Sequence, residues 1–257
     1  MTISNQDAEA LKSLPWPYPR LFAHRGGGAL APENTIAAMR TGAQCGYHAV
    51  EFDVKLSADN HTILLHDDTV DRTSNGTGLA QNMTLAQLQA LDAGSWHSHL
   101  FTGERIPTLS TTAQFLQQHN LLANVEIKPC KGRDAETGEA VALECLKRWH
   151  GHAVAPLLSS FSVAALRAAR KAAPSLAIGL LIDTEPDASV LPLLRELNCV
   201  SLHTNYKHIN EDLLSQFKGE GYRVLCYTVN DPVRISALFA LGVDGQFTDN
   251  LDLNAVN

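Results

Sequence analysis

Acidic side chains alternate with apolar ones in two short stretches of the sequence. In HAVEFDV (48–54), Glu51 and Asp53 alternate with valine and phenylalanine, and in NVEIK (124–128), Glu126 and Lys128 alternate with valine and isoleucine. Successive residues of a β-strand point to opposite faces of its sheet. If both stretches are strands, the apolar residues share one face, and Glu51, Asp53 and Glu126 share the other.

Three carboxylates turned toward one interior repel one another, and burial of an unpaired carboxylate is costly. A cation among them removes that cost. An all-oxygen set without a cysteine favours a hard divalent ion, so the sequence predicts one Mg²⁺ or Ca²⁺ held by Glu51, Asp53 and Glu126. The alternative is a structural ion network with Arg25 and Lys128, in which two basic groups would have to balance three acids.

Two histidines follow apolar stretches and could reach the same place. His24 follows LFA (21–23), and His66 follows TILL (62–65). Imidazole titrates near neutral pH and can give or take a proton during a reaction. A single histidine is more often structural, but two of them beside three inward acids predict an acid–base pair. His203 also ends a predicted strand and is a weaker candidate.

Repeated strand–helix units are needed to bring these residues together. Apolar runs alternate with amphipathic stretches along most of the chain, which is typical of βα units. The main runs number roughly eight, the number that closes a (β/α)8 TIM barrel, whose active sites lie at the carboxyl ends of the strands. An open doubly wound sheet is the alternative, although no GxGxxG turn follows the first run. The predicted strands cover 21–24, 48–54, 62–66, 121–127, 155–161, 176–182, 199–203, 222–229 and 243–248.

Capping signals predict where several helices begin and end. Pro32 and Glu33 are expected in the first turn of a helix, since proline and acidic residues suit that position. Ser162 is expected to cap a helix over 162–172. Asp231 and Gly242 are expected to begin and end the helix that includes Pro232.

The segment 67–107 interrupts the repeat and is too long for an ordinary connection between a strand and a helix. Within it, Thr84 and Gln87 form a capping-box pattern before a short helix that Gly94 is expected to end. We therefore expect one domain over residues 1–257, with an insertion at about 67–107 beside the active face.

Composition excludes several other classes of protein. The chain has 257 residues, of which 45% are hydrophobic, and a formal net charge of −7, so it has a core and no basic field for nucleic acid or anionic membranes. Its five cysteines include no CxxC pair, which favours a reducing compartment. The opening segment does not resemble a signal peptide, and no apolar run is long enough to span a bilayer. We expect a cytoplasmic protein without nucleic-acid partners or stable membrane insertion.

Several motifs occur together in the order typical of one known family. They are His24-Arg25-Gly26, Pro32-Glu33-Asn34-Thr35, Glu51-Phe52-Asp53, His66-Asp67, DRTSNGTG (71–78), Val125-Glu126-Ile127-Lys128, Tyr227-Thr228-Val229-Asn230 and Asp244-Gly245. On these residues the sequence resembles the glycerophosphodiester phosphodiesterase family, and in particular its short cytoplasmic bacterial type. The resemblance extends over residues from about 20 to 250.

The resemblance implies a TIM barrel that hydrolyses glycerophosphodiesters to an alcohol and sn-glycerol 3-phosphate with a divalent cation. The substrate's 2-hydroxyl would attack, and water would open the resulting cyclic phosphate. The resemblance implies that Glu51, Asp53 and Glu126 bind the metal and that His24 and His66 are the general acid and base. It implies that Arg25 and Lys128 contact the phosphate and that Glu33 lies near the metal and the glycerol hydroxyls. Tyr227, where the family usually has tryptophan, would form an aromatic wall for glycerol.

Two other functions remain as alternatives. A related barrel phospholipase would act on intact phospholipid or sphingomyelin and would need a basic or apolar docking surface. No such cluster stands out in the insertion. A barrel that only binds a phosphorylated ligand would not need all five of the residues His24, His66, Glu51, Asp53 and Glu126. The preferred alcohol, the choice between Mg²⁺ and Ca²⁺, the division of roles between the histidines and the oligomeric state stay open.

Overall fold

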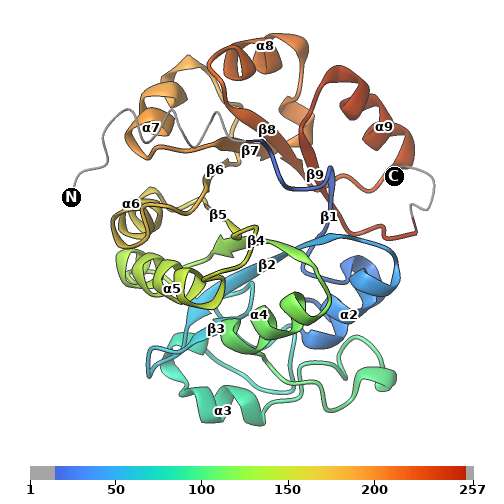
Figure 1. Ribbon diagram of the computed structural model, residues 1–257. Coiled ribbons are helices and arrows are strands. Elements are labelled where there is room, and N and C mark those ends of the chain that lie inside the picture. The colour runs from blue at the N-terminus through green and yellow to red at the C-terminus, as the bar shows by residue number, and fades with distance from the viewer. Residues whose placement is uncertain (1–14, 253–257) are drawn as a thin grey trace.

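A closed barrel of parallel strands forms the centre of the computed structural model, which describes residues 15–252 (Figure 1). The nine strands of this part of the chain lie in the order β1-β9-β8-β7-β6-β5-β4-β2-β3, and β1 also pairs with β2. Because β3 is antiparallel to β2 and lies outside the ring, the remaining strands form the predicted (β/α)8 barrel. The strands are β1 (Leu21–Ala23), β2 (Ala49–Leu56), β3 (Thr62–Leu64), β4 (Leu122–Ile127), β5 (Leu157–Ser160), β6 (Ile178–Ile182), β7 (Ser201–Asn205), β8 (Arg223–Tyr227) and β9 (Gly245–Thr248).

Helices surround the barrel and connect successive strands (Figure 1). Within residues 15–252, every helix is too short or too polar to serve as a membrane span. Residues 1–14 and 253–257, which hold most of the opening segment and both ends of the expected domain, lie outside the described residues. The α-helices are α2 (Ile36–Gln44), α3 (Leu85–Ala90), α4 (Leu109–Gln118), α5 (Asp134–Arg148), α6 (Val163–Ala172), α7 (Leu191–Glu196), α8 (Glu211–Gly219) and α9 (Pro232–Leu241), and the 3-10 helices are η1 (Gly28–Leu30), η2 (Ala80–Asn82), η3 (His99–Phe101), η4 (Ala188–Val190) and η5 (Tyr206–His208).

Most of the predicted caps are confirmed. The Ser162 hydroxyl accepts the hydrogen bond that begins α6, and Asp231 and Gly242 bound α9. Thr84 and Gln87 form the reciprocal capping box of α3. Each such cap satisfies a backbone group that would otherwise lack a partner at the helix end, and is worth about 1 kcal/mol.

Two predicted helix boundaries are wrong. Glu33 does not lie in the first turn of α2, because Asn34 has a φ of 60°, which no right-handed helix accommodates, and the hydroxyl of Thr35 caps the helix instead. Gly94 does not end α3, which stops at Ala90. Glycine at 94 is required for another reason: a Cβ there would lie 1.9 Å from the carbonyl oxygen of Phe101.

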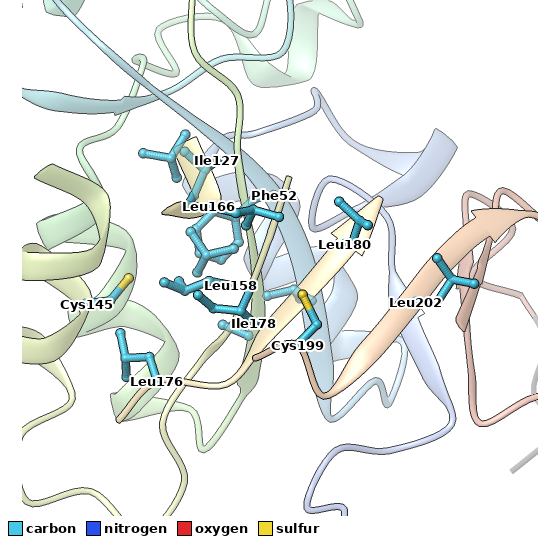
Figure 2. Packing of buried hydrophobic residues seen from close by; sticks show 14 of the residues in the cluster. Phe52, Ile127, Cys145, Leu158, Leu166, Leu176, Ile178, Leu180, Cys199 and Leu202 are labelled. Atoms are coloured by element: carbon cyan, nitrogen blue, oxygen red, sulfur yellow. The ribbon is translucent and has the colours of Figure 1, made fainter. Parts of the chain in front are cut away.

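The main apolar core lies between the barrel and its helices. Phe52 and Ile127 lie on the outer face of the barrel, and Figure 2 shows them near Leu166 of α6. All three are at most 1% exposed. Full burial of one such side chain contributes roughly 1.5–3 kcal/mol, so this layer provides the barrel's rigidity. The prediction that the valine, phenylalanine and isoleucine residues of 48–54 and 124–128 share one face of the sheet is therefore confirmed.

The barrel interior changes from apolar to polar along the strands. On β2 the first inward residue is Ala49, and Glu51 follows two residues later; on β4, Leu122 precedes Asn124 in the same way. Apolar side chains therefore fill the amino end of the barrel, while polar ones line its carboxyl end. The insertion 67–107 lies beside that end and has a separate small apolar cluster with Ile63 of β3.

A stability test follows from the close packing of α5 against α6. A Cβ added to Gly138 of α5 would lie 2.1 Å from the carbonyl oxygen of Ala165, whereas one added to Gly219 of α8 would meet nothing within 4 Å. Overpacking costs about 1–3 kcal/mol, so Gly138→Ala is expected to lower the free energy of unfolding despite the better helix propensity of alanine. Gly219→Ala is the matched control and should leave it equal or raise it. Urea unfolding measures both, and a Gly138→Ala variant as stable as the control would contradict the packing argument.

Candidate active site

Three carboxylates meet at the carboxyl end of the barrel, where β2 and β4 run side by side. The strand register places Asp53 opposite Glu126, and Glu51 lies two residues before Asp53 on the same face. One carboxylate oxygen from each lies within 4.8 Å of the others. All three are at most 9% exposed and line a cavity of about 220 Å³. The predicted inward convergence of these acids is present.

The electrostatics of this acidic trio favour a bound cation. Burial, followed by the charge of Asp53, raises the pKa of both Glu51 and Glu126. Burial acts against ionisation of Asp53 too, but Lys128 and other nearby positive charges prevail and lower its pKa. Within residues 15–252, Glu51 Oε1 is buried without a hydrogen-bond partner. Three hard oxygen donors and an unsatisfied carboxylate oxygen fit a divalent cation.

Two basic residues, Lys128 and Arg25, contact the carboxylates of the trio. Lys128 Nζ lies 2.9 Å from Glu126 Oε1 and 3.4 Å from Asp53 Oδ1. The backbone N–H of Arg25 donates to Glu51 at 2.9 Å, while its side-chain Nε lies 3.8 Å from Asp53. The ion network considered as an alternative is thus present in part, yet it leaves one oxygen of Glu51 unpaired. These cations can therefore hold the trio in place and still leave room for a metal.

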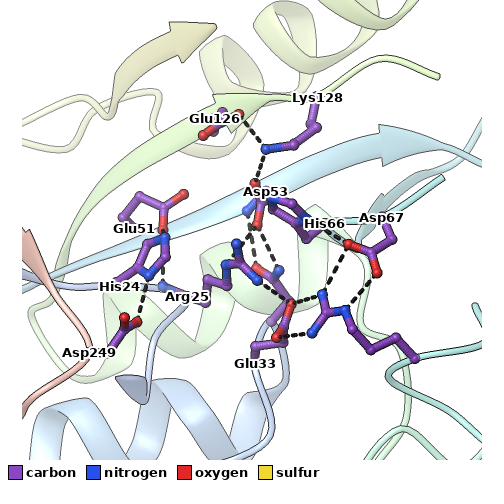
Figure 3. A network of polar contacts seen from close by, with 12 residues as sticks. His24, Arg25, Glu33, Glu51, Asp53, His66, Asp67, Glu126, Lys128 and Asp249 are labelled. Atoms are coloured by element: carbon purple, nitrogen blue, oxygen red, sulfur yellow. Dashed lines mark hydrogen bonds and ion pairs between the residues drawn. The ribbon is translucent and has the colours of Figure 1, made fainter. Parts of the chain in front are cut away.

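His24 and His66 both line this cavity, and each has its own carboxylate partner (Figure 3). His24 Nδ1 lies 2.6 Å from Asp249 Oδ1, and its Nε2 lies 3.8 Å from Glu51 Oε2. His66 Nδ1 lies 2.7 Å from Asp67 Oδ1. A carboxylate on Nδ1 fixes the ring orientation and leaves Nε2 for proton transfer.

The two imidazoles have opposite electrostatic environments. Burial disfavours the protonated form of His24, but the hydrogen bond to Asp249 and the charge of Glu51 outweigh it and raise its pKa. For His66 burial prevails, and its pKa is lowered. Two titratable groups with pKa values moved in opposite directions are typical of an acid–base pair.

Glu33 contacts two arginines, and one of them, Arg25, also lies near Asp53 of the trio. Its Oε1 accepts from Arg25 Nη1 at 2.7 Å, and both of its oxygens also accept from Arg72. The contact with glycerol hydroxyls implied for Glu33 stays a prediction. The observed contact of Glu33 in the cavity region is its hydrogen bond with the side chain of Arg25.

An aromatic wall closes one side of the cavity. The Tyr227 hydroxyl donates to the carbonyl oxygen of Ile182 at 2.8 Å, which fixes the ring, and Phe161 packs against it edge-on with centroids 5.8 Å apart. His203 is fully buried at the base of the same cavity, where its Nε2 lies 2.9 Å from Ser201 Oγ. Tyr227 therefore presents an apolar ring face to whatever the cavity binds.

Sequence reasoning assigned no role to several residues that hold the predicted ones in place, although Asn34, Asp67 and Asn230 occur in the family motifs. Asn34 binds Asp53 through both its amide nitrogen and its oxygen. Asp249 and Asp67 orient the histidines, and Asn230 in turn donates to Asp249 at 3.1 Å. A signal for Asp249 was available, because it follows the last predicted strand and carboxyl ends of strands carry the chemistry in these barrels.

The fold and this site together point to a class of enzyme: a TIM-barrel phosphodiester hydrolase, with three buried carboxylates and two histidines on one cavity at the carboxyl end of the strands. The family model described as the glycerophosphoryl diester phosphodiesterase family matches residues 24–253. The chain belongs to this family, and it is an enzyme that hydrolyses glycerophosphodiesters.

Individual relatives agree along almost the whole chain. A glycerophosphodiester phosphodiesterase of Caldanaerobacter subterraneus is 36% identical over 234 residues, which cover 90% of this chain and 93% of that protein. The structure of an Oleispira antarctica phosphodiesterase in complex with the product sn-glycerol-3-phosphate has a TM-score of 0.87 and 34% identity, over 96% of this chain and 98% of that one. The glycerophosphodiester phosphodiesterase of Agrobacterium tumefaciens has a TM-score of 0.75 and 25% identity, over 93% and 99%.

Proposed function

We propose that this enzyme releases sn-glycerol 3-phosphate and a free alcohol from soluble glycerophosphodiesters, with one divalent cation held by Glu51, Asp53 and Glu126. The observation that carries the proposal is the convergence of both histidines and these carboxylates on one cavity. The product bound in the Oleispira antarctica relative supports the choice of product. The cation is Mg²⁺ or Ca²⁺, as a set of hard oxygen ligands favours.

The side chains of the site match the steps of the proposed reaction. One histidine takes the proton of the substrate's 2-hydroxyl while that oxygen forms a bond to phosphorus. The bond from phosphorus to the alcohol breaks, and the other histidine gives a proton to the departing oxygen. Water then opens the cyclic phosphate. A bound divalent cation supplies charge neutralisation at the phosphoryl oxygens.

Basic side chains and the aromatic wall complete this assignment. Arg25 and Lys128 bind the phosphate oxygens, for which their positions beside the trio suit them. Tyr227 packs against the carbon skeleton of glycerol. Glu33 keeps Arg25 oriented through the hydrogen bond between them, and a contact with a glycerol hydroxyl is proposed for it from the family resemblance.

The proposed location is the cytoplasm, and the chain is proposed to be a single catalytic domain. The five cysteines are scattered along the chain and include no CxxC pair, which supports a reducing compartment. The expected partner is a small diester rather than a nucleic acid or a membrane.

A substrate comparison tests the proposed substrate class. Glycerophosphocholine and phosphatidylcholine vesicles are incubated with the enzyme, with and without EDTA, and glycerol 3-phosphate and choline are measured. We expect release from the soluble diester alone, loss of that release with EDTA, and recovery with added Mg²⁺ or Ca²⁺. Choline or phosphocholine release from the vesicles would favour the phospholipase alternative, and no release from either would favour a binding protein.

A further inference from the structure

Arg72, which lies in the insertion, binds two carboxylates that come from different parts of the chain. Its Nη1 and Nη2 donate to Glu33 at 2.7 and 2.8 Å, and its Nε and Nη2 donate to Asp67 at 2.6 and 3.0 Å. Glu33 lies between β1 and α2, whereas Asp67 follows β3. One guanidinium therefore joins two points of the insertion, one of them just after β3, to the loop between β1 and α2.

Each of these carboxylates also holds a residue of the reaction. Asp67 Oδ1, which Arg72 contacts, lies 2.7 Å from His66 Nδ1. Glu33 Oε1 accepts from Arg25 at 2.7 Å. The chain of contacts thus runs from His66 through Asp67, Arg72 and Glu33 to Arg25.

The Asp67 side chain needs this support. Its backbone carbonyl is fixed by the buried Lys55 Nζ, but its carboxylate is 29% exposed and could rotate toward water. Arg72 contacts both of its oxygens, in the forked geometry that guanidinium and carboxylate groups share. Without Arg72, the negative charges of Glu33 and Asp67 would also face each other without a cation between them.

We infer that Arg72 is a positioning residue of the reaction, which orients His66 through Asp67 and Arg25 through Glu33. The inference rests on the proposed roles of His66 and Arg25. Exposed ion pairs contribute little to stability, and Arg72 is 45% exposed, so its contribution lies in geometry rather than in the free energy of folding. Arginine is required here because a lysine ammonium cannot bind two carboxylates in this forked manner.

The test compares Arg72→Ala with Arg105→Ala in steady-state hydrolysis of glycerophosphocholine. Arg105 is the matched control, since it lies in the same insertion and, among residues 15–252, its guanidinium donates only to the backbone carbonyls of Ala90 and Leu91. Loss of orientation should lower kcat of Arg72→Ala by ~10–100-fold with KM changed less than ~3-fold, since small misplacements cost that much. Arg105→Ala should keep the wild-type kcat, and thermal unfolding should show both variants folded. Equal losses of kcat in both variants would overturn the inference.

Two further measurements separate positioning from a merely structural effect. Asp67→Asn combined with Arg72→Ala should lower kcat no more than the more damaging single change, because both act through His66. Guanidinium ion added at millimolar concentration should restore part of the kcat of Arg72→Ala and none of that of His66→Ala. Additive losses of kcat in the double variant, or a wild-type kcat in Arg72→Ala, would overturn the inference about Arg72 but leave the proposed function intact. Full activity of His66→Ala would instead overturn the proposed catalytic pair.

Discussion

Removal of the divalent cation is expected to abolish hydrolysis of glycerophosphocholine. Asp53→Asn is expected to have the same effect even when the cation is supplied. Asp53 is 1% exposed, shares β2 with Glu51 and lies opposite Glu126 of β4. Loss of its charge weakens the cation site, and the cation's stabilisation of the transition state is worth several kcal/mol, so activity should fall at least ~10²-fold. Release of glycerol 3-phosphate, measured with increasing Mg²⁺ or Ca²⁺, checks this prediction.

The control for this prediction is a carboxylate far from the trio. Glu144 pairs with Arg148 on α5, so Glu144→Gln should retain the wild-type rate. Calorimetry on dialysed enzyme should record one cation bound by the wild type and by Glu144→Gln, and weakened binding by Asp53→Asn. If the wild type takes up none of Mg²⁺, Ca²⁺ or Mn²⁺, the metal site and the proposed reaction are both wrong.

Replacement of either histidine by alanine is the second large effect. His24→Ala and His66→Ala should each lower kcat at least ~10²-fold, the usual contribution of a positioned proton donor or acceptor. His152 is the control, because it is exposed on the loop after α5, and His152→Ala should hydrolyse glycerophosphocholine at the wild-type rate. A near-normal rate for His24→Ala would reject the proposed pair.

A substrate with a better leaving group distinguishes the two histidines. Nitrophenolate needs no proton to depart, so the variant that lacks the general acid should recover most of its kcat on the nitrophenyl ester of glycerol phosphate. The variant that lacks the general base should remain slow on that substrate, because the attacking hydroxyl still has to lose its proton. Recovery in both variants, or in neither, would contradict the division of roles.

The sequence predicted the fold and the acidic trio because both depend on local periodicity. Alternation in 48–54 and 124–128 is enough to assign faces, and the order of the βα units follows from the chain itself. The family resemblance then named the activity, which the comparisons confirm. Residue roles such as those of Arg25 and Tyr227 stay predictions.

The partners of the histidines could not be derived in the same way. His24 and Asp249 are 225 positions apart in sequence, and only closure of the barrel between β1 and β9 brings them into contact. Arg72 lies in an insertion whose path no periodicity describes. The error at Glu33 has a related origin, since the left-handed conformation of Asn34 satisfies the tertiary contact of its amide with Asp53 rather than any local preference.

The apolar side chains at the amino end of the barrel determine where molecules enter and leave this enzyme. Phe22, Leu225 and Phe247 belong to one buried cluster with Leu157 of the distant strand β5, so the interior of the barrel is a filled core and not a channel. Substrate therefore enters, and both products leave, at the same end. A phosphate product that stays in the cavity therefore excludes the next diester. Each new turnover therefore requires that both products have first left through the end at which substrate enters.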